Sequence, residues 1–503
     1  MNNAMPVIRI ILLACCMLPL AVPAAASDAG RNVINLSLEK AIDLACMQSV
    51  DAAIAGNQLK SSYWEFRTYR AERLPELVLS GNLPDYSNNF TPYQHDDGSY
   101  SYVRNNLIGI SGALSITQNI PFTGGTLSLS TSLDLTRQLG HGAMNEFLAI
   151  PVSLTLNQPL FGVNTFKWDK KIEPVKYEEA KAQYLQDVEE IKKNAITYFF
   201  NYLLSAENLG IAEQNMENAD RLYVIALEKR RMGQISETEL MQLKLSALQA
   251  KADVTACQSD VKSKMFQLRA FLGLSENDSI AAELPDKISV GRLEYADVLD
   301  KAIANNPFTQ NILRRQLEAD YEVAAAKGER YRIDLTATVG YSGTNRTLSG
   351  SYGNLGNEQI VSVGLSVPIL DWGKRKGEVK VAESNRDVVE SQIRQDRLNF
   401  NQDVFLIVEQ FNNQAGQLSI AEEADKIASE RYKSSVEAFL LGKMDVLELN
   451  DARDAKDEAR RKYISEMYYY WYYFYDIRAL TLWDYMADRN IRGADEAIFD
   501  ISL

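Results

Sequence analysis

The sequence predicts an α+β membrane protein in which one unit of strands and very long helices occurs twice. Three observations indicate this fold class. The chain from Pro159 to about Ala250 recurs, shifted by 209 positions, from Pro368 to about Ala459. Six segments alternate between apolar and small polar residues, as half-exposed strands do. Long stretches on both sides of Gly233 carry apolar residues at steps of four and three, which is typical of coiled-coil helices.

The amino terminus predicts a signal peptide over residues 1–26. Arg9 precedes an apolar stretch from Ile10 to Leu20, and the small residues Ala24 to Ala26 stand before Ser27. This stretch is shorter than the roughly 20 residues of a transmembrane anchor. Lipid attachment at Cys15 stays open as an alternative. Cleavage removes Arg9 alone among charged residues, so the net charge goes from -14 to -15 and general nucleic-acid binding is not expected.

The mature chain keeps two of the four cysteines, Cys46 and Cys257. One possible disulfide does not make a disulfide scaffold, and Cys257 lies in an apolar helical seam, so we expect a buried thiol there. After the signal peptide there is no run of 18 apolar residues. If the chain crosses a membrane, we therefore expect it to do so as a closed β-barrel, in which every backbone group is paired.

About four barrel strands are expected within residues 76–160 and two within 333–370. Their polar positions are mostly Ser, Thr, Gly and Asn, which suit a water-filled lumen, although a soluble sandwich would alternate in the same way. The apolar positions include Ile108, Ile110, Leu114 and Ile116, then Leu127, Leu129, Leu133 and Leu135, and, in the second half, Val361, Val363, Leu365 and Val367. We place an interfacial aromatic girdle in loops, at Tyr86, Phe90, Tyr93, Tyr100, Tyr102 and Tyr352.

The first half holds an insertion. LSLEKAIDLA at Leu36 to Ala45 resembles LEYADVLDKA at Leu293 to Ala302 with a shift of 257, and 257 minus 209 leaves 48 extra residues between Arg73 and Pro159. We assign them to an additional strand hairpin, Gly125 to Gln158. That hairpin either widens the barrel or packs elsewhere.

The helices form two coiled-coil hairpins, over residues 163–272 with a tip near Gly233 and over 372–483 with a tip near Gly442. Phe166 to Arg230 alone would be roughly 100 Å long. The chain thus divides into a first repeat (27–292), a second repeat (293–483) and a tail (484–503). The apolar seam of the first long helix includes Ile191, Ala195, Tyr202, Ala212, Ala219 and Ala226, and the aromatic run at 468–475 is expected to pack between helices.

Together these features resemble the TolC-like outer-membrane efflux protein family. The resemblance rests on the opening at Leu36 to Ala45, the strand-to-helix junction at Gln158 to Phe161 and the two hairpin tips, and it covers Leu36 to about Trp483. It implies a homotrimer in the bacterial outer membrane, in contact with its lipid, whose strands share one barrel and whose helices form one periplasmic tunnel. Six strands from each chain would make an 18-stranded barrel in place of the family type member's 12.

The resemblance also implies a function, that of the exit duct of a tripartite efflux or type I secretion system. Such ducts work with a periplasmic adaptor (membrane fusion protein) and an inner-membrane transporter of the RND, ABC or MFS class. The resemblance implies that Glu448 and Asp451 form a constriction at the periplasmic entrance. It also implies that the adaptor docks at the hairpin tips, whose residues are Met232, Gly233, Gln234, Leu441, Gly442 and Lys443. Near the second tip the family usually has a basic residue, and this chain has Met444 at that position. The resemblance therefore does not imply a salt bridge that locks the entrance.

Two other classes were weighed. An enzyme is not expected, because His95 and His141 are the only histidines and no catalytic set, cofactor motif or metal-ligand spacing accompanies them. An exported coiled-coil stalk or adhesin would also need a signal peptide and long helices. It would need neither six strands with a lumen-like polar face nor a duplicated hairpin.

Overall fold

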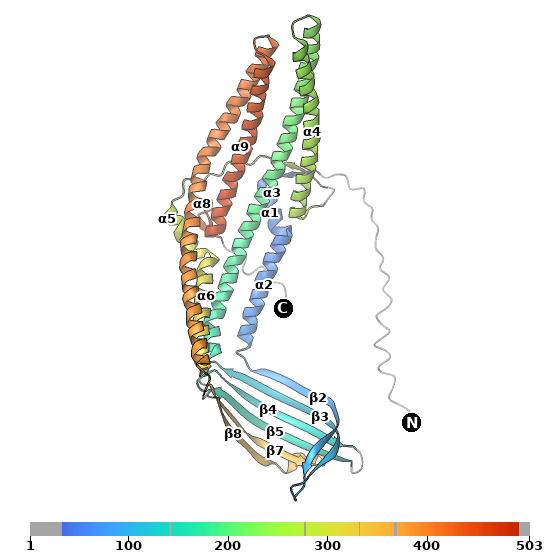
Figure 1. Cartoon of the computed structure of the whole chain (residues 1–503), viewed down its shortest axis with the longest axis vertical. Coiled ribbons are helices and arrows are strands. Elements are labelled where there is room, and N and C mark those ends of the chain that lie inside the picture. The colour runs from blue at the N-terminus through green and yellow to red at the C-terminus, as the bar shows by residue number, and fades with distance from the viewer. Residues whose placement is uncertain (1–32, 140–142, 276–277, 331, 367–369, 492–503) are drawn as a thin grey trace, which may run out of the picture.

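The computed structural model describes residues 33–139, 143–275, 278–330, 332–366 and 370–491. The predicted signal peptide with Cys15, residue His141 and most of the tail lie outside these ranges. The described chain is elongated, with a β-sheet at one end and two helical hairpins that extend away from it (Figure 1). The hairpin tips lie at the end farthest from the sheet (Figure 1).

Six antiparallel strands form the large sheet, in the order β2-β3-β4-β5-β7-β8. Their bounds are β2 Glu76–Gln94, β3 Tyr100–Ile120, β4 Gly125–Gln138, β5 Met144–Pro159, β7 Arg332–Asn345 and β8 Gly356–Ser366. The extra hairpin is β4 and β5, and it lies in the middle of the sheet, between β3 and β7. The insertion therefore widens the sheet and does not pack elsewhere.

The first two strands are longer than the alternation indicated, and this corrects the expected aromatic loops. Tyr86, Phe90 and Tyr93 lie in β2, and Tyr100 and Tyr102 lie in β3. Each of them is paired with a non-aromatic residue of the other strand. Tyr352 lies in the short helix α7 (Leu348–Gly353), which follows β7. Asparagine and proline broke the period-2 pattern here, but pairing with the neighbouring strand extends β2 to Gln94.

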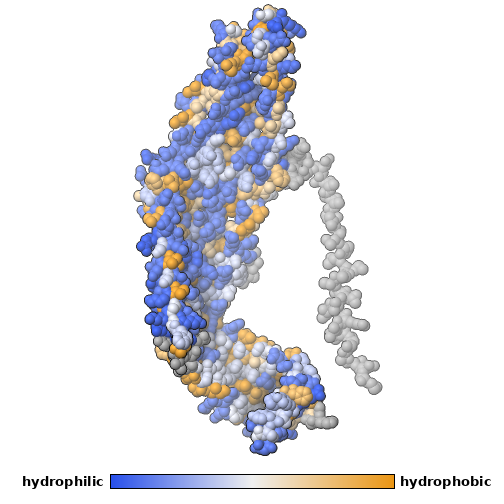
Figure 2. Space-filling model, viewed as in Figure 1, coloured by the Kyte–Doolittle hydropathy of each residue, from blue (hydrophilic) through white to orange (hydrophobic). Residues whose placement is uncertain are grey.

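The two faces of the sheet differ in exposure. On β3 the apolar Ile110, Leu114 and Ile116 are 38%, 41% and 42% exposed, whereas the small residues that alternate with them on the other face are half-buried. The outer face of the sheet is thus apolar, and hydrophobic side chains appear on the sheet beside largely hydrophilic helices in Figure 2. This arrangement is the reverse of a water-soluble surface and is typical of lipid-facing strands.

The helices are α1 (Leu38–Gln48), α2 (Val50–Ala71), α3 (Thr165–Arg231), α4 (Glu237–Leu272), α5 (Tyr295–Asn305), α6 (Pro307–Gly328), α8 (Lys374–Leu440) and α9 (Val446–Thr481), besides α7. Both α3 and α8 have 67 residues, and both α4 and α9 have 36. Equal lengths in both halves reflect the duplication. In the described part of the chain, no helix combines the length and apolar character needed to cross a membrane.

The main hydrophobic core lies midway along the helices. Seam residues Ile191, Ala195 and Tyr202 of α3 are buried there, as the heptad pattern predicts. Phe411 of α8 stacks on Tyr470 of α9 with ring centroids 5.4 Å apart. The aromatic run of α9 thus packs between helices, as expected.

Short elements close this middle region. Strand β1 (Val33–Leu36) pairs in parallel with β6 (Ser279–Ala282), and β9 (Trp483–Asp484) pairs with β10 (Arg489–Asn490). The Tyr202 hydroxyl of α3 donates a hydrogen bond to the carbonyl of Ile280. Both remaining cysteines are free thiols, and Cys257 is half-exposed, so the expected full burial of Cys257 is wrong.

Candidate functional site

The first hairpin tip is a tight turn between α3 and α4. Gly233 has a φ of +73°, a conformation that glycine adopts without strain. Its N–H donates to the carbonyl of Arg230, and the N–H of Gln234 donates to that of Lys229. Ser236 and Glu239 then form a capping box that starts α4.

The second tip repeats this geometry 209 residues later. Gly442 has a φ of +69°, its N–H donates to Phe439, and the N–H of Lys443 donates to Ala438. Asp445 caps α9 by accepting a hydrogen bond from the N–H of Glu448, at 2.8 Å. A Cβ added at either tip glycine would meet no atom within 4 Å, so conformation and not space requires glycine.

The two tips share a cleft of about 520 Å³. Of the residues predicted at the tips, Gln234, Gly442 and Lys443 line this cleft. Met232 and Leu441 do not line it, and their side chains are 64% and 71% exposed. Each tip therefore presents a large apolar side chain to its surroundings, beside a cleft lined by both apolar and polar residues.

Glu448 and Asp451 lie on one exposed face of α9, since residues three apart on a helix are neighbours. Leu449 and Ala452, which directly follow Glu448 and Asp451 in the chain, are buried. The carboxylate of Asp451 accepts a hydrogen bond from Arg431 of α8 at 2.7 Å, and this ion pair is largely exposed.

The two acidic side chains thus have different surroundings. Glu448 lines the cleft between the tips, and its carboxylate has no ion-pair partner among the described residues. The ion pair joins two helices, because Arg431 of α8 and Asp451 of α9 are 20 residues apart in the chain. Sequence reasoning missed Arg431, because helical spacing alone does not show which residue of α8 faces Asp451.

Polar contacts hold the two hairpins together between the hydrophobic core and the tips. Arg460 of α9 contacts Glu207 of α3 at 3.0 Å and Asp425 of α8 at 3.4 Å. Asn215 of α3 donates to Asp457 of α9 at 2.6 Å. These contacts lie between the hydrophobic core and the tips, so the hairpins are joined by charged and polar groups there.

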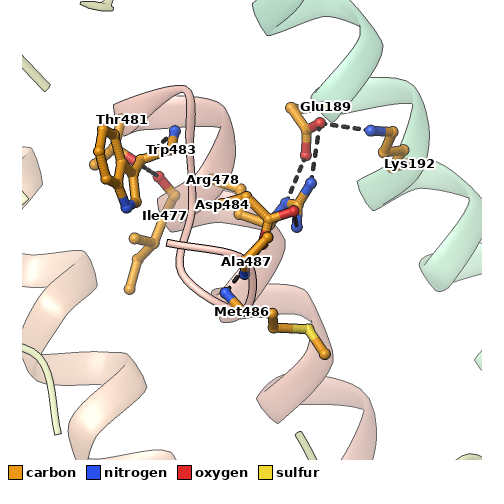
Figure 3. Close-up of polar contacts among 9 residues, drawn as sticks. All are labelled: Glu189, Lys192, Ile477, Arg478, Thr481, Trp483, Asp484, Met486 and Ala487. Carbon is orange, nitrogen blue, oxygen red and sulfur yellow. Dashed lines mark hydrogen bonds and ion pairs between the residues drawn. The ribbon is translucent and has the colours of Figure 1, made fainter. Parts of the chain in front are cut away.

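A buried ionic network lies in the core (Figure 3). Glu189 of α3, which is 0% exposed, accepts a hydrogen bond from Arg478 of α9 at 3.0 Å and pairs with Lys192 at 2.6 Å. Arg478 also pairs with Asp484 of β9 at 3.0 Å. The network joins both halves of the chain and holds the segment after α9.

The pKa values of this network follow from its geometry. Burial alone would raise the pKa of Asp484, but the charge of Arg478 and the backbone N–H groups of Ala487 and Met486 lower it below the usual value. Burial raises the pKa of Tyr475 to about 12. In the described residues, no group of three or more His, Cys, Asp or Glu side chains could hold a metal ion.

The chain resembles known proteins in sequence and in fold. The family model for outer membrane efflux proteins matches residues 57–274 and 298–468. The CmeC outer membrane channel of Campylobacter jejuni aligns over 95% of this chain and 93% of its own, with a TM-score of 0.66 and 14% identity. No curated protein matches.

Two further solved structures share the fold. The outer membrane protein VceC of Vibrio cholerae aligns over 90% of this chain and 97% of its own, with a TM-score of 0.63 and 13% identity. The MtrE outer membrane channel of Neisseria gonorrhoeae, in its open state, aligns over 93% of this chain and 95% of its own, with a TM-score of 0.60 and 14% identity.

Proposed function

Because the chain belongs to the outer membrane efflux protein family, whose members are channels and not enzymes, we propose that it is the exit duct of a tripartite efflux or type I secretion system. It is an outer-membrane efflux protein with its helical part in the periplasm. The exported stalk or adhesin is not favoured, because family membership accounts for strands and hairpins together. The observation that carries the proposal is the duplicated pair of hairpins on an apolar-faced sheet.

The duct is proposed to be a homotrimer. One chain offers six strands with unpaired edges at β2 and β8, whereas about eight strands are the fewest that close a barrel. Three copies would supply eighteen. Native mass measurement of the full chain in detergent should give three times the mass of one chain, and a stable monomer would overturn the proposal.

The hairpin tips are proposed to contact a periplasmic adaptor. The exposed apolar side chains of Met232 and Leu441 lie beside a cleft of mixed apolar and polar lining, which suits a protein partner that buries both kinds of group. Replacing Gly233 and Gly442 with leucine should abolish export, because leucine is strained at positive φ. A matched control is Gly416→Leu, on an exposed stretch of α8 with nothing within 4 Å of the added Cβ. Unchanged export by the tip double variant, at equal membrane insertion, would place docking elsewhere.

Glu448 and Asp451 are proposed to set the ion preference of the periplasmic entrance. Threefold symmetry would repeat each carboxylate three times around one axis, and rings of carboxylates favour cations. Because Arg431 compensates Asp451, most of the net negative charge would come from Glu448. The reversal potential across a planar bilayer should show weaker cation preference for the double variant Glu448→Gln, Asp451→Asn than for wild type. Equal cation preference in wild type and in the double variant would mean that Glu448 and Asp451 do not form a ring of carboxylates at the entrance.

The inner-membrane partner is proposed to be a transporter of the RND, ABC or MFS class, reached through the adaptor. Photo-cross-linking from Met232 and Leu441, followed by identification of the captured proteins, would distinguish the three classes. Capture of no adaptor from either position would contradict docking at the tips.

A further inference from the structure

A row of small residues crosses the outer part of the sheet. Gly81 of β2 pairs with Gly112 of β3, Gly112 pairs with Leu133 of β4, and Leu133 pairs with Ala149 of β5. Ala149 pairs in turn with Gly343 of β7. Directly paired residues point to the same face, so Leu133 carries the one large side chain of this row, beside three glycines and an alanine.

Three members of this row, Gly81, Gly112 and Leu133, line an apolar groove of about 550 Å³, which is within the size range of small-molecule sites. A Cβ at Gly112 would meet no atom within 4 Å, so the groove is open above it. At the other end of the row, helix α7 lies against Gly343 and Ala149. The lining side chains include Leu79, Leu83, Ile110, Leu135, Phe147 and Leu348.

The groove opens on the apolar face of the sheet. Ile110 is 38% exposed, Leu133 and Leu135 continue the same alternation on β4, and Leu79 and Leu83 are 79% and 78% exposed. In an outer-membrane protein such a face contacts lipid. The groove is therefore a recess in a surface surrounded by acyl chains.

Its height on the sheet indicates the membrane leaflet. Strands β2, β5 and β8 join the periplasmic helices at Glu76, Pro159 and Ser366. Leu135 of β4 and Phe147 of β5 lie toward the opposite strand ends, Ile110 lies midway along β3, and α7 follows the end of β7 at Asn345. The end of the groove beside α7 consequently lies on the side of the outer leaflet.

A positive charge stands beside the groove on the same face. Arg137 follows Leu133 and Leu135 at period 2 on β4 and pairs with Ile108 and Asn145, so it is roughly 13 Å outward from the floor. It is exposed and makes no ion pair within the described ranges. Arginine on a lipid-facing surface costs little only near the interface, where a phosphate can accept its hydrogen bonds.

We propose that this groove binds one acyl chain of an outer-leaflet lipid whose phosphate is held by Arg137. The recess fits an apolar chain because its lining is almost entirely apolar, and the guanidinium complements an anionic headgroup by charge-assisted hydrogen bonds. The lipid would pack against Leu348 and fix α7 on the sheet. This role is independent of the channel's partners and of its ion preference.

The test uses the full chain, extracted from outer membranes into neutral detergent and titrated with dioleoyl phosphatidic acid or dioleoylglycerol. Native mass spectrometry counts the lipid bound per chain. Gly112→Leu should lower the affinity for both lipids at least tenfold, because the new side chain occupies the open floor. Arg137→Gln should lower the affinity for phosphatidic acid about tenfold and leave dioleoylglycerol unchanged.

Matched controls separate a site from general lipid contact. Ala337→Leu adds the same kind of bulk to β7 outside the groove lining, and Arg104→Gln removes an arginine that bonds Asn88 on the β2 and β3 extension. Both should bind like wild type. Leu348→Ser, at a half-exposed position, tests the groove if Gly112→Leu does not fold. The proposal is overturned if Gly112→Leu or Leu348→Ser binds as Ala337→Leu does, or if the two arginine variants behave alike.

Discussion

Replacing Arg478 with alanine should loosen the contact between the two halves of the chain. The side chain of Arg478 is 9% exposed, and its partner Glu189 is fully buried. Breaking a buried ion pair by removing one partner costs about 3–5 kcal/mol, because the other charge is left uncompensated. Lys192 still pairs with Glu189 in the variant, so we expect the lower end, about 3 kcal/mol of local opening free energy.

Hydrogen–deuterium exchange of the full chain measures this loss directly. Since each 1.4 kcal/mol is a factor of ten, amides in the last turns of α9 and around Glu189 should exchange about a hundredfold faster. Arg221→Ala is the control, because Arg221 pairs with Glu217 on an exposed surface, where the side chains are 67% and 70% exposed. It should leave exchange near its own site almost unchanged.

The double variant Glu189→Met, Arg478→Met adds a second comparison. Replacing both members of a buried pair with apolar residues is often nearly neutral, so this protein should regain most of the protection lost in Arg478→Ala. If Arg478→Ala exchanges no faster than Arg221→Ala, the network contributes no more than a surface pair. Burial would then add nothing to the stabilisation by Arg478 and Glu189.

Three further outcomes follow from the same contacts. Arg431→Gln should strengthen the cation preference measured by reversal potential, because it uncovers Asp451, whereas Asp451→Asn should weaken it; the opposite signs would exclude this pair from the entrance. Because the pKa of Asp484 is lower in the folded protein than in the unfolded chain, where it is about 3.9, its carboxylate stabilises the fold at pH values above 3.9. This stabilisation is lost as the pH falls through the lower pKa of the folded state. Asp484→Asn should therefore make the melting temperature less dependent on pH in acid. Gly442→Val should speed amide exchange at the second tip, and Gly442→Asn should do so less, since asparagine tolerates positive φ; equal effects would argue against conformational strain.

The sequence predicted the features that depend on local pattern. The turn at Gly233 and its copy at Gly442 could be located because positive φ at a tight turn selects glycine, and the offset of 209 residues carried the same turn into both halves. The lengths of α3 and α8 followed from a sustained apolar seam. The extra strand pair followed from comparing two offsets.

Features that depend on pairing at a distance could not be predicted in this way. The bond between Arg478 and Glu189 joins residues 289 positions apart, and no local pattern indicates it. The outer part of β2 contains Pro84, Asn88 and Asn89, which disfavour strands, yet its partner β3 supplies hydrogen bonds as far as Gln94. Arg431 was missed for the same reason, since only the packed hairpin brings it to Asp451.

The inserted hairpin of β4 and β5 has an evolutionary consequence. A single added strand would reverse the direction of every later strand and send the following helix to the wrong side of the membrane. An added pair preserves the edge strands β2 and β8 and the exit direction of each helix. A lineage can therefore change the width of its sheet in steps of two strands per chain, while the direction in which each helix leaves the sheet stays the same.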